Sequence, residues 1–322
     1  MDKNILDTPC NSGDSIWFYF HSKKDGKAWG VCGKLSLICY IIIFYSMLFM
    51  PVRKEYILFW GGCRLIKSFY RLMIELTNGR WTSALLKRFA QSKWSRLAIP
   101  SFSKIFNINE SEMEREIKDY GSLHEFFIRR LKEGVRVPDE SPDSVVSPVD
   151  AVIEDIGSIQ STRIITVKGK DYSISEMLGE EKAEKYTGGT YMIFYLSPSH
   201  YHRIHSPVTG KVEDQWVLGS KSYPVNKWGL RFGRDTLSKN YRNITEVVHG
   251  TAMIAIVKVG AMFVNSIELI HEGDHLEKGK EMAYFSFGST VILLFEKGKF
   301  ELDSSLKAPA HIKVGERIGN LI

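Results

Sequence analysis

The sequence predicts an α+β protein in which N-terminal amphipathic helices precede a mostly-β core with barrel-sandwich-like hairpins. Apolar residues recur at helical spacing between residues 64 and 98. From about residue 145, short β-rich runs such as TYMIFYL, TAMIAIVKV and TVILLFE are separated by turns that contain Gly or Pro. The chain has 322 residues, 44% of them hydrophobic and 25% charged, which is the composition of a globular protein with one or two compact units.

The positive charge is concentrated in one segment. Residues 51–100 contain ten Lys or Arg against Glu55 and Glu75, a local charge of +8, whereas the whole chain carries +6. The rest of the chain is therefore near −2, and the basic segment favours an anionic surface as its partner.

All four cysteines lie early in the chain, at Cys10, Cys32, Cys39 and Cys63. The remaining residues contain none, so the main body is neither a disulfide scaffold nor a Cys-ligated zinc protein. Its stability must come from a buried core.

The first 63 residues form an N-terminal extension with one long apolar segment. Residues 35–52 lack any charge and are just long enough to span a bilayer. They are interpreted as a membrane anchor, as an uncleaved signal-like segment, or as a product of an upstream start codon, because Met50 and Met73 offer internal starts. No small-residue cleavage site follows them.

Residues 64–140 are predicted to be a helical, membrane-docking region. Two amphipathic helices are expected over residues 64–98, separated by a stop at Asn78-Gly79. Basic residues flank Trp81 and Trp94, as in helices that rest on anionic lipid, although plain core packing would give the same spacing.

A further helix is expected over residues 109–133, with Asn109 or Ser111 as its cap. Residues 141–322 then form the β-rich domain. The composition changes there from helix-forming to β-branched and aromatic runs.

The β-rich part contains an internal repeat. The segment SPVDAVIED (147–155) is similar to SPVTGKVED (206–214), and residues 273–285 share a turn-then-strand pattern with residues 312–322. Such turns resemble the hairpins of biotinyl- and lipoyl-type domains, and a two-fold β-barrel sandwich would explain both pairs.

Three histidines stand close together in YLSPSHYHRIHSPVTG (195–210), namely His200, His202 and His205. Imidazole is a common zinc ligand, but no Cys and no H-E-x-x-H pattern completes a site. Acid–base catalysis is the favoured interpretation, with structural or surface roles as the alternative.

Two further segments bear reactive groups. Asp150 lies in SPVDA (147–151), where an acidic residue after Pro is ordinary turn chemistry. In Phe287-Gly288-Ser289-Thr290, a Gly-Ser pair before a strand is either a β-bulge or a strained bond. With a base nearby, such a bond undergoes an N-to-O acyl shift, and elimination then cleaves the chain and leaves a carbonyl in place of the serine.

These features occur together and in this order in phosphatidylserine decarboxylases, and the sequence strongly resembles that family from about Tyr70 to the C-terminus. The matching segments are FFIRRLKEG (126–134), SPVDA (147–151), YLSPSHYHRIHSP (195–207), KSYPVN (221–226), LSKNYR (237–242), VGAMFVNSIE (259–268) and FGST (287–290). FGST departs from the common LGST by one apolar residue and keeps the Gly-Ser pair.

The resemblance implies that the chain is a proenzyme that cleaves itself between Gly288 and Ser289. Ser289 would become a covalent pyruvoyl group, the only cofactor. Asp150, His205 and Ser289 would form the charge-relay set for this cleavage, because a serine needs a base and a carboxylate orients that base.

The resemblance also implies conversion of phosphatidylserine to phosphatidylethanolamine and CO₂ through a Schiff base on the pyruvoyl group, without a metal. His202 would lie near the substrate, whereas His200 would be structural. Arg203, Lys239 and Arg242 are unranked candidates for binding the phosphate.

The implied partners are phosphatidylserine in an anionic membrane and the association of fragments 1–288 and 289–322 with each other. No nucleic acid is expected, and homo-oligomers are left open. The implied location is the cell membrane, peripheral on its cytoplasmic side, with residues 35–52 as a candidate anchor. Residues 1–63 lie outside the resemblance.

Two other function classes compete. A biotinyl- or lipoyl-type carrier needs a Lys at a hairpin tip, as in M-K-M, and the sequence has none. A membrane-associated serine hydrolase would use Ser289, His205 and Asp150 without chain cleavage, but the usual G-x-S-x-G elbow is missing.

Overall fold

The computed structural model describes residues 18–21, 28–31, 87–167, 169–221, 223, 225, 235–261, 267–286 and 289–322. The chain forms two compact units, Met1–Phe59 and Trp60–Ile322. In the first, β1 (Phe18–His21) pairs antiparallel with β2 (Ala28–Val31). Residues 35–52 and Trp81 lie outside the described residues, as does the first predicted helix. No helix within the described ranges is long and apolar enough to cross a membrane.

The helical part of the second unit consists of short helices. After a helical stretch at residues 87–91 come η2 (Lys93–Ala98), α4 (Ile99–Phe106), η3 (Glu110–Glu112), η4 (Ile117–Asp119) and α5 (Leu123–Phe127). Asn109 does cap a helix, since its side chain accepts a hydrogen bond from Ser111 N at 3.2 Å. The continuous helix expected over residues 109–133 is nevertheless wrong, because Ser122 caps a new helix by accepting from Glu125 N.

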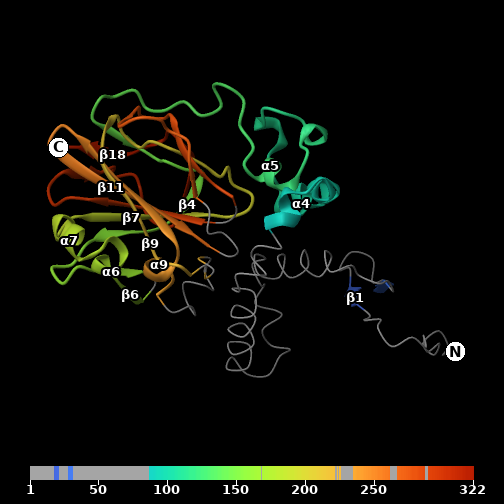
Figure 1. The fold of residues 1–322 in the computed structure, drawn as a ribbon, viewed down its shortest axis with the longest axis horizontal. Coiled ribbons are helices and arrows are strands. Elements are labelled where there is room, and N and C mark those ends of the chain that lie inside the picture. Colours follow the sequence, from blue (N-terminus) through green and yellow to red (C-terminus); the bar gives the residue numbers. More distant parts are fainter. Residues whose placement is uncertain are drawn as a thin grey trace, which may run out of the picture. The chain divides into compact units, whose positions relative to one another are not determined.

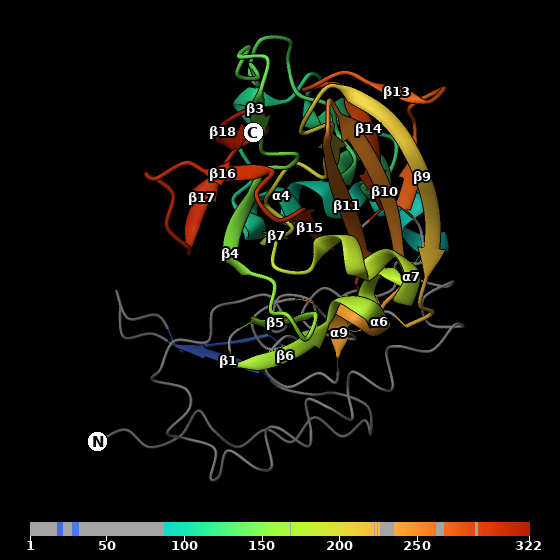
Figure 2. The ribbon, with the colours of Figure 1, turned by 90° about the vertical axis from the view of Figure 1, so that its left-hand side faces the viewer.

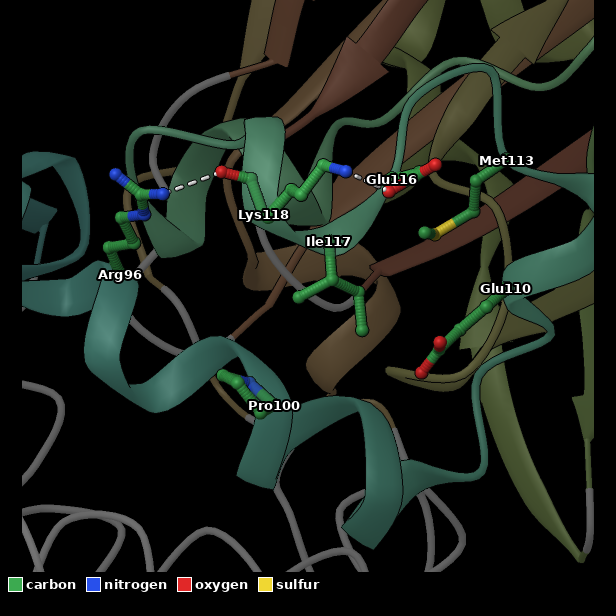
Figure 3. Close-up of a pocket in the computed structure, with 7 residues that line it drawn as sticks. All are labelled: Arg96, Pro100, Glu110, Met113, Glu116, Ile117 and Lys118. Carbon is green, nitrogen blue, oxygen red and sulfur yellow. Dashed lines mark hydrogen bonds and ion pairs between the residues drawn. The ribbon is translucent and has the colours of Figure 1, made fainter.

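These short helices enclose a small apolar cluster that explains the breaks. Its members are Ile99, Ile108, Met113, Tyr120 and Phe126. Figure 3 shows a pocket of about 540 Å³ beside this cluster, where Arg96 donates to Lys118 O at 2.6 Å. None of the predicted site residues lines this pocket.

The centre of the second unit is an eight-stranded antiparallel sheet (Figures 1 and 2). Its order is β13 (His275–Leu276), β9 (Gly210–Leu218), β10 (Arg242–His249), β11 (Ala252–Gly260), β15 (Ser289–Phe295), β7 (Thr190–Leu196), β4 (Ala151–Ser158) and β17 (Ala310–Ile312). The central strands are the apolar runs of the sequence, and they are buried on both faces.

Different elements cover the two faces. One face packs against two three-stranded sheets, formed by β12 (Ile267–Leu269), β14 (Glu281–Phe285) and β8 (Arg203–His205), and by β16 (Phe300–Leu302), β18 (Arg317–Leu321) and β3 (Ser144–Val146). The other packs against α6 (Ile174–Leu178), α7 (Glu180–Ala183), η5 (Glu184–Tyr186), α9 (Thr236–Lys239) and the hairpin of β5 (Ile164–Val167) and β6 (Lys170–Ser173). Figure 1 shows α6, α7 and α9 gathered on that side.

The α+β class with a mostly-β core is therefore confirmed, but the described strands do not close into a barrel. The large sheet ends at β13 on one side and at β17 on the other. Both end strands are short, two and three residues, and the chain passes from each into a separate three-stranded sheet. The sheet consequently stays open.

The internal repeat is confirmed by strand pairing. In one half, the hairpin β17–β18 pairs with β4 and β3; in the other, β13–β14 pairs with β9 and β8. The turns that begin with SPV at residues 147–149 and 206–208, here called the SPV corners, also bond to each other. Val146 N donates to Pro207 O at 3.0 Å, and His205 N donates to Pro148 O at 2.8 Å.

Candidate active site

Ser289 is the first residue of β15 and lies in the middle of the large sheet. It pairs with Leu196 of β7 on one side and with Gly260 of β11 on the other. The side chain is fully buried, and its Oγ has no hydrogen-bond partner within the described residues. Buried hydroxyls are normally bonded, so this one is chemically conspicuous. Gly288 lies outside the described residues.

Sheet order brings the other predicted residues to the end of the sheet where Ser289 lies. Strand β4 begins directly after Asp150, and its Val152 pairs with Tyr195 near the end of β7. The chain leaves β7 after Leu196 and carries the three histidines in the following loop and β8. Since neighbouring strands are about 4.8 Å apart, the starts of β4 and β15 lie roughly 10 Å apart across β7.

Asp150 is 7% exposed and already has strong partners. Its Oδ1 accepts from Arg136 Nε and from Val314 N, both at 2.9 Å, and its Oδ2 accepts from Arg136 Nη2 at 2.5 Å. Arg136 also donates to Glu112 Oε2 at 2.7 Å. The Asp150 carboxylate is therefore held by an arginine and a backbone N–H. Among the described residues it has no hydrogen bond to His205.

His205 is held at both ring nitrogens. Its Nδ1 lies 2.7 Å from Gly279 O, so this nitrogen carries the hydrogen and Nε2 keeps the lone pair. That Nε2 lies 3.1 Å from the hydroxyl of Tyr201. Burial lowers the pKa of His205, while the bond to Gly279 and the charges of Glu281 and Asp150 act to raise it. At neutral pH His205 is an uncharged base.

His202 is fully buried and has one free nitrogen. Its Nδ1 lies 2.9 Å from His200 O, whereas its Nε2 has no partner in the described part of the chain. The ring of Phe127 lies 3.9 Å from its centre, and Phe285 N donates to His202 O at 3.0 Å. Burial, and then the charge of Arg129, hold the pKa of His202 well below its ordinary value.

His200 ties the loop after β7 together. Ser197 N donates to its Nδ1 at 3.0 Å, and burial lowers the pKa of His200 to about 4. Its imidazole is thus neutral at pH 7 and acts as a hydrogen-bond acceptor for the backbone.

Comparison with known proteins places the chain in a family. The family model for phosphatidylserine decarboxylase matches residues 123–320. A phosphatidylserine decarboxylase proenzyme from Anoxybacillus flavithermus is 59% identical over 258 residues, which are 80% of this chain and 97% of the relative. One from Geobacillus sp. is also 59% identical over 258 residues, covering 80% of this chain and all of the relative. The chain belongs to the phosphatidylserine decarboxylase family.

A Bacillus cereus proenzyme of the same name is 58% identical over 253 residues, or 78% of this chain and 97% of that protein. The resemblance drawn from the motifs is thereby confirmed. Of the predicted residues in this decarboxylase-family chain, Asp150 and the three histidines lie in the segments at the end of the sheet where Ser289 begins β15. The hydrogen bonds of the described residues include none among Asp150, His205 and Ser289.

Sequence reasoning missed Arg129, which lies two residues after the end of the short helix α5. This side chain is 3% exposed, and its Nη2 donates to Ser199 O and His200 O, each at 3.0 Å. Its Nε and Nη1 have no partner among the described residues, and burial lowers its pKa to about 10. The sequence signal for this residue is its position inside the apolar run FFIRRL (126–131), which predicts burial. A buried arginine indicates a functional role, because buried guanidinium groups are rare unless paired.

The phosphate candidates named from the sequence are already occupied. Arg203 donates to Glu281 Oε2 at 2.7 Å, and Lys239 donates to Asp235 Oδ2 at 2.6 Å. Arg242 donates to backbone carbonyls, among them that of Met177 at 2.7 Å.

Proposed function

We propose that this chain is the precursor of a phosphatidylserine decarboxylase, cleaved by its own residues between Gly288 and Ser289. The observation that carries the proposal is the buried, unpartnered hydroxyl of Ser289 at the start of β15, in a chain that belongs to this family. A hydroxyl in that state is free to become a nucleophile once a base removes its proton.

Cleavage starts when the proton of Ser289 Oγ passes to a neutral imidazole. His205 is the proposed base, since its Nε2 keeps a lone pair, and Asp150 is the proposed carboxylate that supports it. The oxygen attacks the carbonyl carbon of Gly288, the amide nitrogen takes a proton and leaves, and an ester links the two fragments. Loss of the Cα proton of residue 289 then breaks the ester and releases the Gly288 carboxylate. Water next hydrolyses the amine end of residue 289, so that a ketone forms and the nitrogen leaves as ammonia.

The residues present fit the resulting pyruvoyl group. The side chain of Ser289 is buried and has no competing hydrogen bond from the described residues, and its strand partner Leu196 leads into the loop of His202. Formed at position 289, this group would supply a ketone for the serine amine of the lipid and a sink for the electrons released with CO₂. The neutral Nε2 of His202 can hold a proton for the reacting carbon, and the free N–H groups of Arg129 suit the head-group phosphate.

A denaturing gel with mass spectrometry tests the cleavage. We expect the purified chain to appear as fragments 1–288 and 289–322, and Ser289→Ala to remain one uncut chain without decarboxylase activity. Ser305→Ala, an exposed serine in the small fragment, serves as the control and should be cleaved normally. An uncut wild-type chain with hydrolase activity would instead support the serine-hydrolase alternative.

We further propose that residues 64–140 dock the catalytic domain, residues 141–322, on anionic membranes from the cytoplasmic side. Trp94 and Leu97 of η2 are each 78% exposed. Because they lie three residues apart in a 3₁₀ helix, their side chains share one face. Exposed Lys93 and Arg96 stand beside them. Such a surface buries its apolar tips in the interface while its cations face phosphate groups.

Vesicle pelleting tests the docking surface. We expect tight binding to anionic vesicles, weaker binding to neutral ones, and a steep fall with salt, because each basic residue near the surface contributes about 1 kcal/mol. Trp94→Ser with Leu97→Ser should weaken binding, whereas Val217→Ser, at an exposed apolar position outside residues 64–140, should not. Equal binding by all variants at every salt concentration would contradict the docking proposal.

A further inference from the structure

The His205 side chain faces a row of polar groups that ends on a carboxylate other than Asp150. The hydroxyl of Tyr201 lies 3.1 Å from His205 Nε2 and donates to Glu281 Oε1, also at 3.1 Å. Glu281 is the direct cross-strand neighbour of His205, from β14 to β8. Its other oxygen, Oε2, accepts from Arg203 at 2.7 Å.

The proton positions follow from these partners. The carbonyl of Gly279 can only accept, so Nδ1 of His205 carries a hydrogen in every state. A second proton must therefore sit on Nε2, where it points at the oxygen of Tyr201. With the Tyr201 hydroxyl turned to Glu281, the positive imidazolium is joined to a negative carboxylate through one hydroxyl.

We propose that Tyr201 and Glu281 are positioning residues for self-cleavage, which stabilise His205 when Nε2 holds the proton taken from Ser289. The inference rests on the proposed function and extends it to two residues outside the Asp150, His205, Ser289 set. The step is a proton transfer: the O–H bond of Ser289 breaks, an N–H bond forms on His205, and Glu281 stays a carboxylate throughout.

The arrangement of Asp150 supports this division of labour. Both oxygens of Asp150 are engaged by Arg136 and Val314 N, and Glu281 is likewise paired with Arg203, with Arg130 at 3.9 Å. The hydrogen-bonded path to His205, rather than the balance of charge, therefore distinguishes the two carboxylates. Four groups face His205 with charge or a titratable hydroxyl: Glu281 and Asp150 favour the imidazolium, Arg203 disfavours it, and Tyr201 bridges. Of the two carboxylates, only Glu281 is linked to the ring by hydrogen bonds in the described residues.

The first experiment titrates His205 in the uncut precursor. In the Ser289→Ala chain, NMR of labelled histidines should show that the pKa of His205 falls by about one unit in Glu281→Gln, because a facing carboxylate is lost. Tyr201→Phe should shift it in the same direction. Glu277→Gln, an exposed carboxylate in the same hairpin, is the matched control and should leave the pKa unchanged.

The second experiment measures cleavage in chains that keep Ser289, by pulse-labelled synthesis and a chase between pH 5 and 9. We expect Glu281→Gln and Tyr201→Phe to slow cleavage ~10- to 100-fold and to move the acid limb of the rate profile to lower pH. The variant with both substitutions should cleave no more slowly than the slower single variant, because Tyr201 and Glu281 act through the same chain of hydrogen bonds.

The outcomes separate cleanly. If the wild-type chain is never cut, the proposed function fails. If it is cut, but the pKa of His205 and the acid limb are the same in wild type, Glu281→Gln and Tyr201→Phe, the two residues have only a structural role and the inference is overturned. A slower rate with an unmoved limb counts against it too, and melting curves identify variants that are merely unfolded.

Discussion

The two halves of the internal repeat share one backbone design and differ in their chemistry. Ser147 N donates to Glu316 O and Ser206 N donates to Lys280 O, both at 2.8 Å. Each of these serines also donates its hydroxyl to a carbonyl two residues on, at 2.8 and 2.6 Å. Because both corners are built alike, the side chains that differ between them are the ones that distinguish a reactive site from a plain turn.

The first difference is the residue that accepts the hairpin N–H. Asp150 accepts from Val314 N at 2.9 Å, and at the equivalent place Thr209 accepts from Lys278 N at 3.0 Å. Asp150 is buried and paired with Arg136, whereas Thr209 is exposed. A neutral hydroxyl thus suffices for the turn, and the charge at position 150 has another purpose.

The second difference is the cross-strand pair beside the corner. In the half that contains SPVTG (206–210), His205 stands opposite Glu281. In the half that contains SPVDA (147–151), the equivalent pair is Val146 opposite Arg317. The acid–base pair therefore belongs to one half and Asp150 to the other. The exchanged bonds between Val146, Pro148, His205 and Pro207 place them side by side.

The largest effect is expected from exchanging the acceptors of the two corners. Asp150→Thr keeps an acceptor for Val314 N, as Thr209 does for Lys278 N, but removes the charge. We expect it to fold yet to cleave at least about 10³-fold more slowly, because triad carboxylates contribute on that scale. A gel time course measures this, with Thr209→Asp as the mirrored control that is cleaved normally. Normal cleavage of Asp150→Thr would show that position 150 only holds the turn.

A somewhat smaller effect is expected from separating the two histidines of the SPVTG half. His202→Gln should be cut like wild type but lose decarboxylation by about 10²- to 10⁴-fold, since its free Nε2 is proposed to act on the substrate. His205→Val, which copies Val146, should accumulate uncut precursor. Gel analysis and a CO₂-release assay on the same samples check both. Equal cleavage defects would refute the separation of roles.

The strands and turns could be predicted from the sequence, whereas the residues that bond to Asp150 and His205 could not. The apolar runs gave the central strands, and the repeated SPV motif gave both corners with their hairpins. The residues that hold Asp150 and His205 come from elsewhere: Arg136 precedes β3, and Glu281 lies on β14. Such pairs depend on strand register and on the crossing of the corners, which local pattern does not encode.

In the helical part, the local pattern predicts a longer helix than the structure contains. Residues 109–133 have helical spacing, yet Tyr120 and Phe126 turn inward to one apolar cluster and break the helix. The separate short helix α5 brings Phe127 against His202, and the chain just after it brings Arg129 to the carbonyl of His200. Tertiary burial outweighed helix propensity there.

A moderate effect is expected on the acid stability of the SPVTG half. His200 has a pKa of about 4 in the fold against an ordinary value of 6.5, so the unfolded chain binds the proton first as pH falls. Stability is therefore complete above about pH 6.5 and decreases toward pH 4, by on the order of 2 kcal/mol at pH 5 from this group. Melting of the Ser289→Ala chain should show this loss, and His200→Asn should flatten it. An equal loss in both chains would assign the acid sensitivity to other groups.

The smallest effect is expected at the exposed corner itself. Thr209→Val removes the acceptor for Lys278 N, but water reaches this turn, so the loss of stability should be only about 0.5 kcal/mol. Cleavage should be unchanged, because no proposed step uses position 209, and Thr209→Ser should restore the wild-type melting curve. The contrast with Asp150→Thr is the test of the whole comparison: the two positions hold equivalent turns, so a large effect at Thr209 would mean that turn geometry, rather than the charge of Asp150, controls the reactive corner.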